Sequence, residues 1–233
     1  MHLNTYKTKI KRDLIMKVLA FNGSPRKNWN TATLLNKALE GAALQGAETE
    51  LIHLYDLNYK GCKSCFACKT KGGKSYGKCP VKDDLTAIYK KVEEADAIIF
   101  GSPVYFGRIS GEMASFMERL LFPYLIYSKT EPSLFPKKIN TGFIYTMNAP
   151  ENEEILKLYE HNWILNEFGL KRIFGASESL CSFDTYQFDD YSKVAVTSFD
   201  PEMKAKRREE EFPKDCAKAF DMGVRFATEG IIV

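Results

Sequence analysis

The sequence predicts an α/β fold in which a parallel β-sheet is covered by helices on both faces. Continuous apolar runs recur along the chain, as expected for parallel strands that are buried on both faces. Most of these runs end in a polar turn, and apolar residues at helical spacing then follow. Five such strand–helix units imply a parallel sheet whose strands are joined by right-handed crossovers.

Length and charge suit one domain without a polyanionic partner. The chain has 233 residues, 45% of them hydrophobic, which suffices for one sizeable core. We expect residues 1–15, which are basic and polar, to form an extension outside the fold, and residues 16–233 to form a single domain. The net charge is +3, from 33 basic and 30 acidic residues mixed along the chain. This balance gives no electrostatic case for nucleic acid or an anionic membrane as a partner.

Composition also predicts the compartment. No apolar run in the sequence approaches the ~20 residues that a membrane-spanning helix needs. The six cysteines fall short of the density of a secreted disulfide scaffold, and the first residues contain no apolar segment of a secretory signal. We therefore expect a cytoplasmic protein.

The first strand and the loop that follows it are the most informative stretch. The apolar run over 18–21 fits a buried strand, which breaks into the turn cluster Asn-Gly-Ser-Pro before helical spacing begins at Thr31. A phosphate is stabilised at such a helix N-terminus by unpaired backbone N–H groups and by the helix dipole. Ser24, Asn30 and Thr31 offer hydroxyl and amide donors, and Arg26 offers a charged fork that can pair two phosphate oxygens.

Helix capping and two other nucleotide-binding motifs are the alternatives to a phosphate loop of this kind. The same residues could merely cap the helix, because Ser, Thr and Asn are the usual caps. No GxGxxG follows the strand, so a dinucleotide fingerprint is missing. Gly73-Lys74-Ser75 mimics the end of a Walker A loop, but Cys68 stands where the first glycine of that motif belongs.

The rest of the chain continues the alternation. Apolar spacing and turn signals predict the following elements in order: a strand over 50–57, a cysteine-rich loop over 58–80, a helix over 83–95, a strand from 96 into a turn at 101–107, a helix from Ser110, a long connection over 122–138, a strand over 139–147, a helix over 151–168 that Gly169 ends, a strand over 170–180, and a C-terminal helical segment over 201–229 that is broken near Pro213. Residues 181–200 are aromatic and acidic without a period, so no element is assigned to them. The charge run over 204–211 is predicted to be a solvated face.

Three of the predicted strands end in polar loops, over 22–33, 102–107 and 146–150. In doubly wound sheets, ligands bind beyond the carboxyl ends of the strands, where such loops meet. One phosphate loop together with two loops rich in Pro, Gly, Tyr and Phe suits a phosphorylated planar aromatic ligand. Flavin mononucleotide (FMN) meets that description, as other nucleotides also do.

Two loops carry a resemblance to a known family. Gly23-Ser24-Pro25-Arg26 with Asn30-Thr31, followed by the run Gly-Ser-Pro-Val-Tyr-Phe-Gly over 101–107, resembles the flavodoxin-like NAD(P)H-dependent FMN reductases, and within them most closely the iron–sulfur flavoprotein branch. The resemblance covers roughly residues 16–180. It implies a flavodoxin-like, doubly wound, five-stranded parallel sheet of strand order 2-1-3-4-5, tightly bound FMN, and a homodimer or homotetramer.

The resemblance also implies a set of FMN-binding residues. Those expected to hold the phosphate are Ser24, Arg26, Asn30 and Thr31. Those expected to line the isoalloxazine are Pro103, Val104, Tyr105, Phe106 and Gly107, with Thr146 and Asn148 reaching it from the third loop. The implied reaction is hydride transfer from NAD(P)H to the flavin, followed by electron delivery to a small acceptor such as a quinone or free flavin, or to a redox protein. No acid–base residue is assigned, because the difficult chemistry belongs to the flavin.

A second motif lies in the cysteine-rich loop. Cys62-x2-Cys65-x2-Cys68-x10-Cys79-Pro is similar to bacterial ferredoxin spacing, in which thiolates hold a [4Fe–4S] cluster. Zinc could also take four thiolates, although it usually shows two separated CxxC pairs. Free thiols in an oligomer interface or a substrate wall are the third alternative. The ten-residue gap before Cys79 is longer than in the iron–sulfur flavoproteins, but a longer flexible loop costs little extra entropy to close.

Two functions of different classes follow from these motifs. The first is an FMN-dependent NAD(P)H oxidoreductase. The second is an iron–sulfur flavoprotein that carries electrons between partner proteins. We further expect the cysteine loop to lie near the flavin, because the second strand should lie beside the first. Cys181 and Cys216, far away in the sequence, are expected to be structural.

Overall fold

The computed structural model describes residues 15–195 and 197–229. The extension predicted over residues 1–15 therefore lies outside the described residues, apart from residue 15. Five parallel strands form the sheet in the order β2-β1-β3-β5-β6, and a sixth short strand, β4, pairs antiparallel with β3. The strands are β1 Lys17–Asn22, β2 Glu48–His53, β3 Ala97–Tyr105, β4 Arg108–Ile109, β5 Asn140–Thr146 and β6 Glu178–Ser182.

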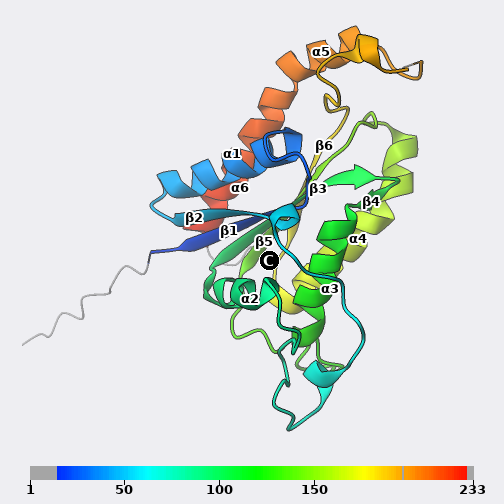
Figure 1. The fold of residues 1–233 in the computed structure, drawn as a ribbon. Helices are drawn as coiled ribbons and strands as arrows, with labels where there is room; N and C mark the ends of the chain where they lie inside the picture. Colours follow the sequence, from blue (N-terminus) through cyan, green and yellow to red (C-terminus); the bar gives the residue numbers. More distant parts are fainter. Residues whose placement is uncertain (1–14, 196, 230–233) are drawn as a thin grey trace, which may run out of the picture.

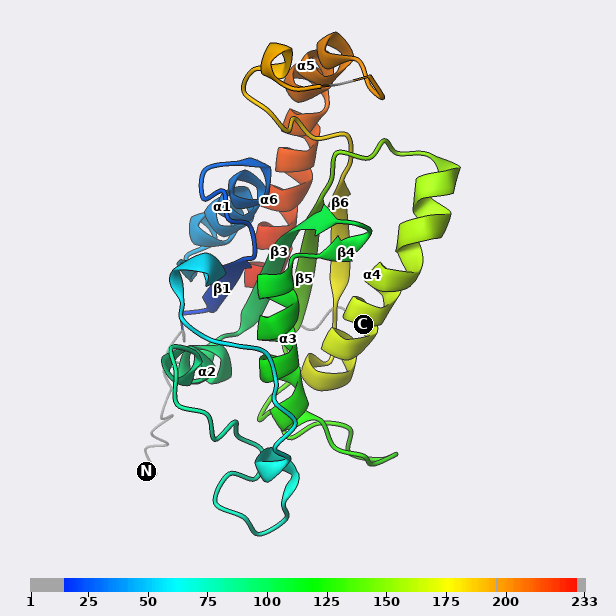
Figure 2. The same ribbon diagram turned by 45° about the vertical axis from the view of Figure 1, so that its right-hand side comes forward.

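Helices cover both faces of this sheet, as Figures 1 and 2 show. One face carries α1 and α6, and the other carries α2, α3 and α4, while α5 stands beyond the carboxyl ends of the strands. The helices are α1 Asn30–Leu44, α2 Leu85–Glu94, α3 Gly111–Tyr124, α4 Glu153–Phe174, α5 Pro201–Glu210 and α6 Phe212–Thr228, with short 3-10 turns η1 Leu54–Asp56, η2 Ala67–Lys69 and η3 Tyr191–Lys193. The predicted flavodoxin-like fold is confirmed, since the five parallel strands follow the order 2-1-3-4-5; β4 is an addition that was not predicted.

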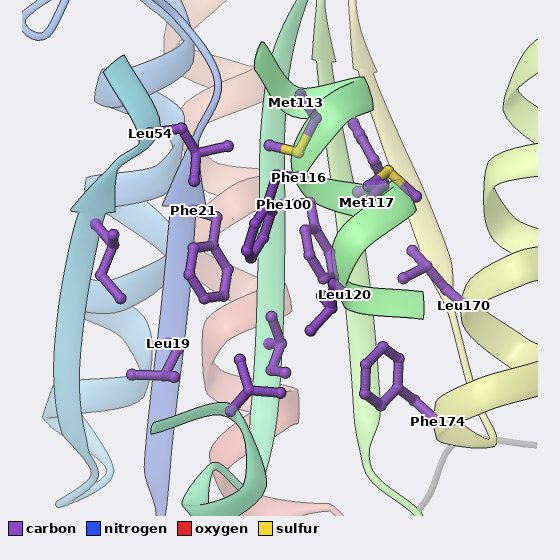
Figure 3. Close-up of a cluster of buried hydrophobic side chains, with 14 of the residues drawn as sticks. Leu19, Phe21, Leu54, Phe100, Met113, Phe116, Met117, Leu120, Leu170 and Phe174 are labelled. Carbon is purple, nitrogen blue, oxygen red and sulfur yellow. The ribbon is translucent and has the colours of Figure 1, made fainter. Parts of the chain in front are cut away.

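Aromatic side chains fill the core between the sheet and α3. Phe21 of β1 is paired in register with Phe100 of β3, which is in turn paired with Phe143 of β5, so all three lie on one face of the sheet. Phe116 of α3 packs on this row, with its ring centroid 4.6 Å from that of Phe21 (Figure 3). These buried rings, each worth roughly 1.5–3 kcal/mol of burial, fix α3 over the centre of the sheet.

On the opposite face, α1 and α6 cross in direct backbone contact. A Cβ atom on Gly223 would lie 1.7 Å from the carbonyl oxygen of Ala38, and one on Gly41 would lie 2.1 Å from that of Phe220. No side chain fits at these positions, so the two glycines allow the close approach. The position of α1, and with it the position of its N-terminus, is therefore fixed by the C-terminal helix α6.

Several predicted boundaries are wrong. The strand predicted over 50–57 ends where η1 begins, and β3 continues through most of the turn predicted over 101–107. Gly169 does not end the fourth helix: α4 continues to Phe174 and ends at Gly175, whose φ of 107° is strained for other residues. Leu170 and Phe174 are buried, and their packing outweighs the roughly 1 kcal/mol that a glycine costs inside a helix. The fifth parallel strand accordingly begins later than predicted, as β6. The break near Pro213 is confirmed, because α5 ends just before α6 begins, with this proline in the first turn of α6.

Candidate functional site

The loop after β1 is held in place by its own polar residues. Asn22 is buried at the end of β1, and its Oδ1 accepts a hydrogen bond of 3.0 Å from the backbone N–H of Ser24. The hydroxyl of Ser110 donates to the carbonyl of Gly23 at 2.6 Å, and thereby joins the start of α3 to this loop. A Cβ on Gly23 would lie 2.8 Å from Cβ of Met113, so only glycine fits there without a shift of the loop.

This loop delivers the N-terminus of α1 without a side-chain cap. The N-cap residue is Trp29, whose side chain forms no capping hydrogen bond. Thr31 and Asn30 are buried but bond elsewhere: Thr31 Oγ1 lies 2.8 Å from Thr146 Oγ1, and Asn30 Nδ2 donates to the carbonyl of Tyr186 at 2.7 Å. The alternative that these residues merely cap α1 is therefore wrong. The end of the helix retains the N–H groups and the dipole that favour an anion.

A cleft of about 440 Å³ lies at this N-terminus, beyond the carboxyl ends of β1, β3 and β5. Its size falls in the range of small-molecule sites in proteins, about 300–1,000 Å³. Nine of the eleven residues that the resemblance implies line it: Ser24, Arg26, Asn30, Thr31, Pro103, Val104, Tyr105, Thr146 and Asn148.

Phe106 and Gly107 do not line this cleft, contrary to expectation. They form the two-residue turn between β3 and β4, with φ values of 50° and 76°. Positive φ at both positions is the geometry of a tight hairpin turn, in which the chain reverses direction. The turn points Phe106 into solvent, fully exposed, and places Gly107 against α4, where its carbonyl accepts a bond from Asn162.

A fourth wall of the cleft comes from a segment to which the sequence assigned no element. This cover segment, residues 185–189 between β6 and η3, lines the cleft together with Pro103 and its neighbours. The carbonyl of Tyr186 accepts bonds from Trp29 Nε1 (3.0 Å) and Asn30, and the carbonyl of Gln187 accepts one from Arg26 Nη1 (2.5 Å). Neither period nor motif could have found it, because the contacts that bring it to the cleft come from residues more than 150 positions away.

The polar groups of the cleft include a guanidinium, a phenol and a side-chain amide. The guanidinium of Arg26 stacks 3.8 Å from the ring centroid of Trp29. Burial raises the pKa of Tyr105, although the charge of Arg26 opposes this, so the phenol stays protonated at neutral pH. Among the described residues, Asn148 Oδ1 is buried without a hydrogen-bond partner. A buried acceptor of this kind costs free energy unless a ligand N–H satisfies it.

The cysteine-rich loop lies elsewhere. After η1 the chain follows α3 to the far end of that helix, as Figures 1 and 2 show, and Cys79 Sγ accepts a bond of 3.2 Å from Arg119 Nε there. The 14 residues of α3 span about 21 Å, and the phosphate loop touches the opposite end of the helix. The expectation that the cysteine loop lies near the cleft is therefore wrong within one chain. Strand β2 does lie beside β1, but the loop travels away after β2 ends.

Cys62, Cys65, Cys68 and Cys79 nevertheless converge. All four line one small cavity of about 20 Å³, and none forms a disulfide. Across residues 15–195 and 197–229, no group of three or more His, Cys, Asp or Glu side chains is arranged to hold a metal ion. The four thiols are thus the donor set that a cluster would need, but in this conformation they do not form a metal-binding geometry.

Solved structures resemble the fold over almost the whole chain. An NAD(P)H:quinone oxidoreductase from Methanothermobacter marburgensis superimposes with a TM-score of 0.64, at 14% identity over 93% of this chain and 100% of that one. An FMN-dependent NADH-azoreductase from Bacillus anthracis, solved in complex with FMN, gives 0.61 at 13% identity over 92% and 100%. At these identities the likeness shows the flavodoxin-like fold alone. In the part of the chain that the structure describes, no helix is long and apolar enough to cross a membrane.

Relatives found by sequence identify a narrower group than the solved structures do. The chain is 46% identical over 104 residues to an iron–sulfur flavoprotein of Methanocaldococcus jannaschii, which is 45% of this chain and 51% of the relative. It is 43% identical over 104 residues to an iron–sulfur flavoprotein of Archaeoglobus fulgidus, which is 45% and 48% of the two chains. The match therefore spans about half the length of these curated relatives. It supports the predicted resemblance to the iron–sulfur flavoprotein branch.

The family model of the NADPH-dependent FMN reductases matches residues 16–138. This match runs from β1 to the connection after α3 and so includes the phosphate loop, the cysteine-rich loop and the β3 loop. It covers more than half of the chain. The chain therefore belongs to the NADPH-dependent FMN reductase family.

Proposed function

We propose that the protein is an FMN-dependent oxidoreductase that takes a hydride from NAD(P)H and passes electrons to a small acceptor such as a quinone or free flavin. When bound, FMN supplies the redox chemistry, because it accepts the two electrons of a hydride and returns them to an acceptor. The observation that carries the proposal is the cleft at the carboxyl edge of the sheet, where nine separately expected residues meet at the uncapped N-terminus of α1.

The residues of the cleft suit the parts of this ligand. The N-terminus of α1 and the guanidinium of Arg26 would hold the phosphate, since both supply N–H donors and positive charge. Pro103, Val104 and Tyr105 would form the wall against the planar ring. The unpartnered Oδ1 of Asn148 would accept an N–H of the ring, and this bond would also remove the cost of a buried unpaired acceptor.

Titration of the flavin-free protein with FMN tests the proposal. The wild type should bind one FMN per chain, and the complex should oxidise NADH or NADPH with a quinone as acceptor. Gly23→Ala should weaken FMN binding at least about tenfold, because the new Cβ would force the phosphate loop away from Met113. Gly111→Ala is the matched control, since its Cβ would meet nothing within 4 Å. Wild-type protein that binds no FMN at millimolar concentration would refute the proposal.

A second candidate function rests on the cysteine cavity. In that case the protein is an iron–sulfur flavoprotein that passes single electrons between partner proteins, with Cys62, Cys65, Cys68 and Cys79 as ligands of a [4Fe–4S] cluster. An anaerobic visible spectrum with iron and acid-labile sulfide assays tests it. About four iron and four sulfide per chain, with negligible turnover of NAD(P)H, would favour the carrier. A flavin spectrum from a sample without iron would favour the reductase over the carrier.

We also propose that the protein is a homo-oligomer built on one FMN-binding domain over residues 16–233. Beside α4 lies a groove of about 700 Å³ with mainly apolar walls from α3 and α4. Five large apolar side chains of α4 are exposed: Leu156, Leu158, Ile164, Leu165 and Phe168. A second copy of the chain would cover this face, because exposed apolar patches of this kind mark association surfaces. Light scattering should give a dimer or tetramer, and Phe168→Asp should shift it towards the monomer.

A further inference from the structure

Helix α5 carries a row of cations near the cleft. The positively charged residues Lys204, Arg207 and Arg208 lie three and four positions apart, so they share one face of the helix. The charge run over 204–211 was predicted to be solvated, but Lys204 is only 1% exposed and the two arginines are half-buried. In Figures 1 and 2, α5 stands beyond the carboxyl edge of the sheet, on the side of the phosphate loop. The prediction of a solvated face is wrong for these three side chains.

Two of the three cations have carboxylate partners. Lys204 pairs with Asp184 and also donates to the carbonyl of Asn148 at 3.1 Å, so it ties the residue just before the cover segment to the loop after β5. Arg207 Nη2 pairs with Asp215 Oδ2 at 2.8 Å, and the same carboxylate oxygen accepts a bond from Ser182 at 2.6 Å. The charges of these two side chains are thus balanced inside the protein.

Arg208 differs from both. Its Nη1 donates to Asn30 Oδ1 at 2.8 Å, and its guanidinium lies 4.2 Å from the ring centroid of Phe212. Within residues 15–195 and 197–229, it forms no ion pair. Burial lowers the pKa of Arg208, as expected for a desolvated cation, but an arginine remains charged at any physiological pH. A half-buried cation without a counter-charge is stabilised by any anion that binds nearby.

The contact with Arg208 determines how Asn30 is oriented. A guanidinium can only donate hydrogen bonds, so the atom of Asn30 that faces it must be the carbonyl oxygen. The amide nitrogen then faces the carbonyl of Tyr186, which can only accept. Asn30 is the first residue of α1 and lines the cleft. Arg208 therefore acts from behind the cleft wall on the residue that opens the phosphate-binding helix.

We propose that Arg208 is a positioning residue of the anion site: it orients Asn30 at the N-terminus of α1 and, together with Arg26, supplies uncompensated positive charge by which the cleft selects a phosphomonoester. The inference rests on the proposed FMN site, which it extends to a helix that the family match over residues 16–138 does not include. The selected feature is the phosphate, so the contribution of Arg208 should distinguish FMN from riboflavin, which has the same ring and no phosphate.

The test compares dissociation constants for FMN and riboflavin, measured by flavin fluorescence on the flavin-free full chain. Arg208→Gln should raise the FMN dissociation constant about tenfold, the size expected for a hydrogen bond of a charged group, and the riboflavin constant less than about twofold. Arg208→Lys, which keeps the charge, should fall between wild type and Arg208→Gln. Lys206→Gln is the matched control, because Lys206 is a cation of the same helix that is 71% exposed. It should change neither constant.

A double variant tests the route through Asn30. In an Asn30→Ala background, Arg208→Gln should weaken FMN binding by less than about threefold, because neighbours that act through one contact are not additive. Equal losses for FMN and riboflavin would reduce Arg208 to a structural residue of α5 and overturn the inference. A full tenfold loss in the Asn30→Ala background would overturn the positioning role, because Arg208 would then act by its charge alone. Wild-type protein that binds neither flavin refutes the proposed function, whereas wild type that binds FMN with an unchanged preference in Arg208→Gln refutes this inference alone.

Discussion

The cleft at the carboxyl edge of the sheet and the cysteine cavity at the far end of α3 are built in different ways. The cleft collects short loops that follow separate strands, and the sheet brings these loops together because parallel strands end at one edge. The cysteine cavity comes chiefly from one long loop that returns on itself. It depends on a few polar anchors to α3 and not on the sheet. Strand topology therefore positions the first site, whereas local anchors position the second.

The anchors of the cysteine cavity centre on Arg119. This side chain is 3% exposed, pairs with Asp83 at 2.9 Å, and donates to the carbonyl of Lys60 and to the sulfur of Cys79. Lys69 adds a second anchor, since its ammonium donates to the carbonyls of Pro123 and Leu125 at the end of α3. The two anchors join both halves of the loop to one helix.

The largest effect is expected from removing the first anchor. Arg119→Met should lower the free energy of unfolding by about 3–5 kcal/mol, because Asp83 is left as a largely buried, unpaired carboxylate. Urea denaturation measures it, and FMN affinity of the folded fraction should stay within about twofold of wild type. Lys157→Met is the control, since its pair with Glu153 is exposed and worth only about 0.5 kcal/mol or less. Loss of FMN binding in folded Arg119→Met protein would show that the two regions are coupled.

A smaller effect is expected from the buried hydroxyl pair of the cleft. Thr31→Val leaves the hydroxyl of Thr146 buried without its partner, which should cost about 1–2 kcal/mol of stability. The double variant Thr31→Val/Thr146→Val removes both polar groups and should recover most of that loss in urea denaturation. Its FMN affinity should nevertheless remain below that of wild type, because both hydroxyls line the cleft. Additive losses in the double variant would mean that the two hydroxyls do not bond to each other.

The cover segment provides the next test. Trp29→Phe keeps an aromatic ring under Arg26 but removes the N–H that donates to the carbonyl of Tyr186. We expect a loss of about 1 kcal/mol, the usual value of one such bond, seen as a roughly fivefold weaker affinity for FMN. Proteolysis should also cut residues 185–189 faster in the variant than in the wild type. If cleavage became faster but the affinity for FMN did not change, the cover segment would make no contribution to FMN binding.

What the sequence could predict follows the same division. It was predictable that the phosphate-loop residues and those from Pro103 to Tyr105 share one cleft, because a strand that ends in a polar turn places its next residues at the ligand edge of a parallel sheet. Phe106 and Gly107 lie outside the cleft, and the sequence did not show this, since the hairpin turn that removes them depends on the backbone geometry of β4. The prediction that Gly169 ends a helix was also wrong, because packing of its neighbours outweighed a local helix-breaking signal.

The other features that the sequence did not predict depend on contacts between residues far apart in the chain. The cover segment has no period, and bonds from Trp29 and Asn30, more than 150 residues away, hold it over the cleft. The cations of α5 resemble any solvated charge run until the tertiary structure shows which of them face inward. The direction of the cysteine loop was likewise undetermined, since a loop of more than twenty residues can reach either end of the helix it follows.

The smallest effect is expected in the reactivity of the cysteines, which differ in exposure and in pKa. Burial raises the pKa of Cys181 to about 12, and it also raises the pKa of Cys68, although Lys69 opposes the second shift. A raised pKa leaves less thiolate at a given pH, so alkylation of metal-free protein at pH 8 should modify the exposed Cys65 first, Cys68 more slowly, and Cys181 only after unfolding. Peptide mass spectrometry after iodoacetamide treatment gives the rates. Raising the pH to 9.5 should accelerate the labelling of Cys68 but leave Cys181 protected. If Cys65 and Cys68 reacted at one rate, the cavity around the four thiols would be open in solution, and the anchors on α3 would not hold the loop as the structure has it.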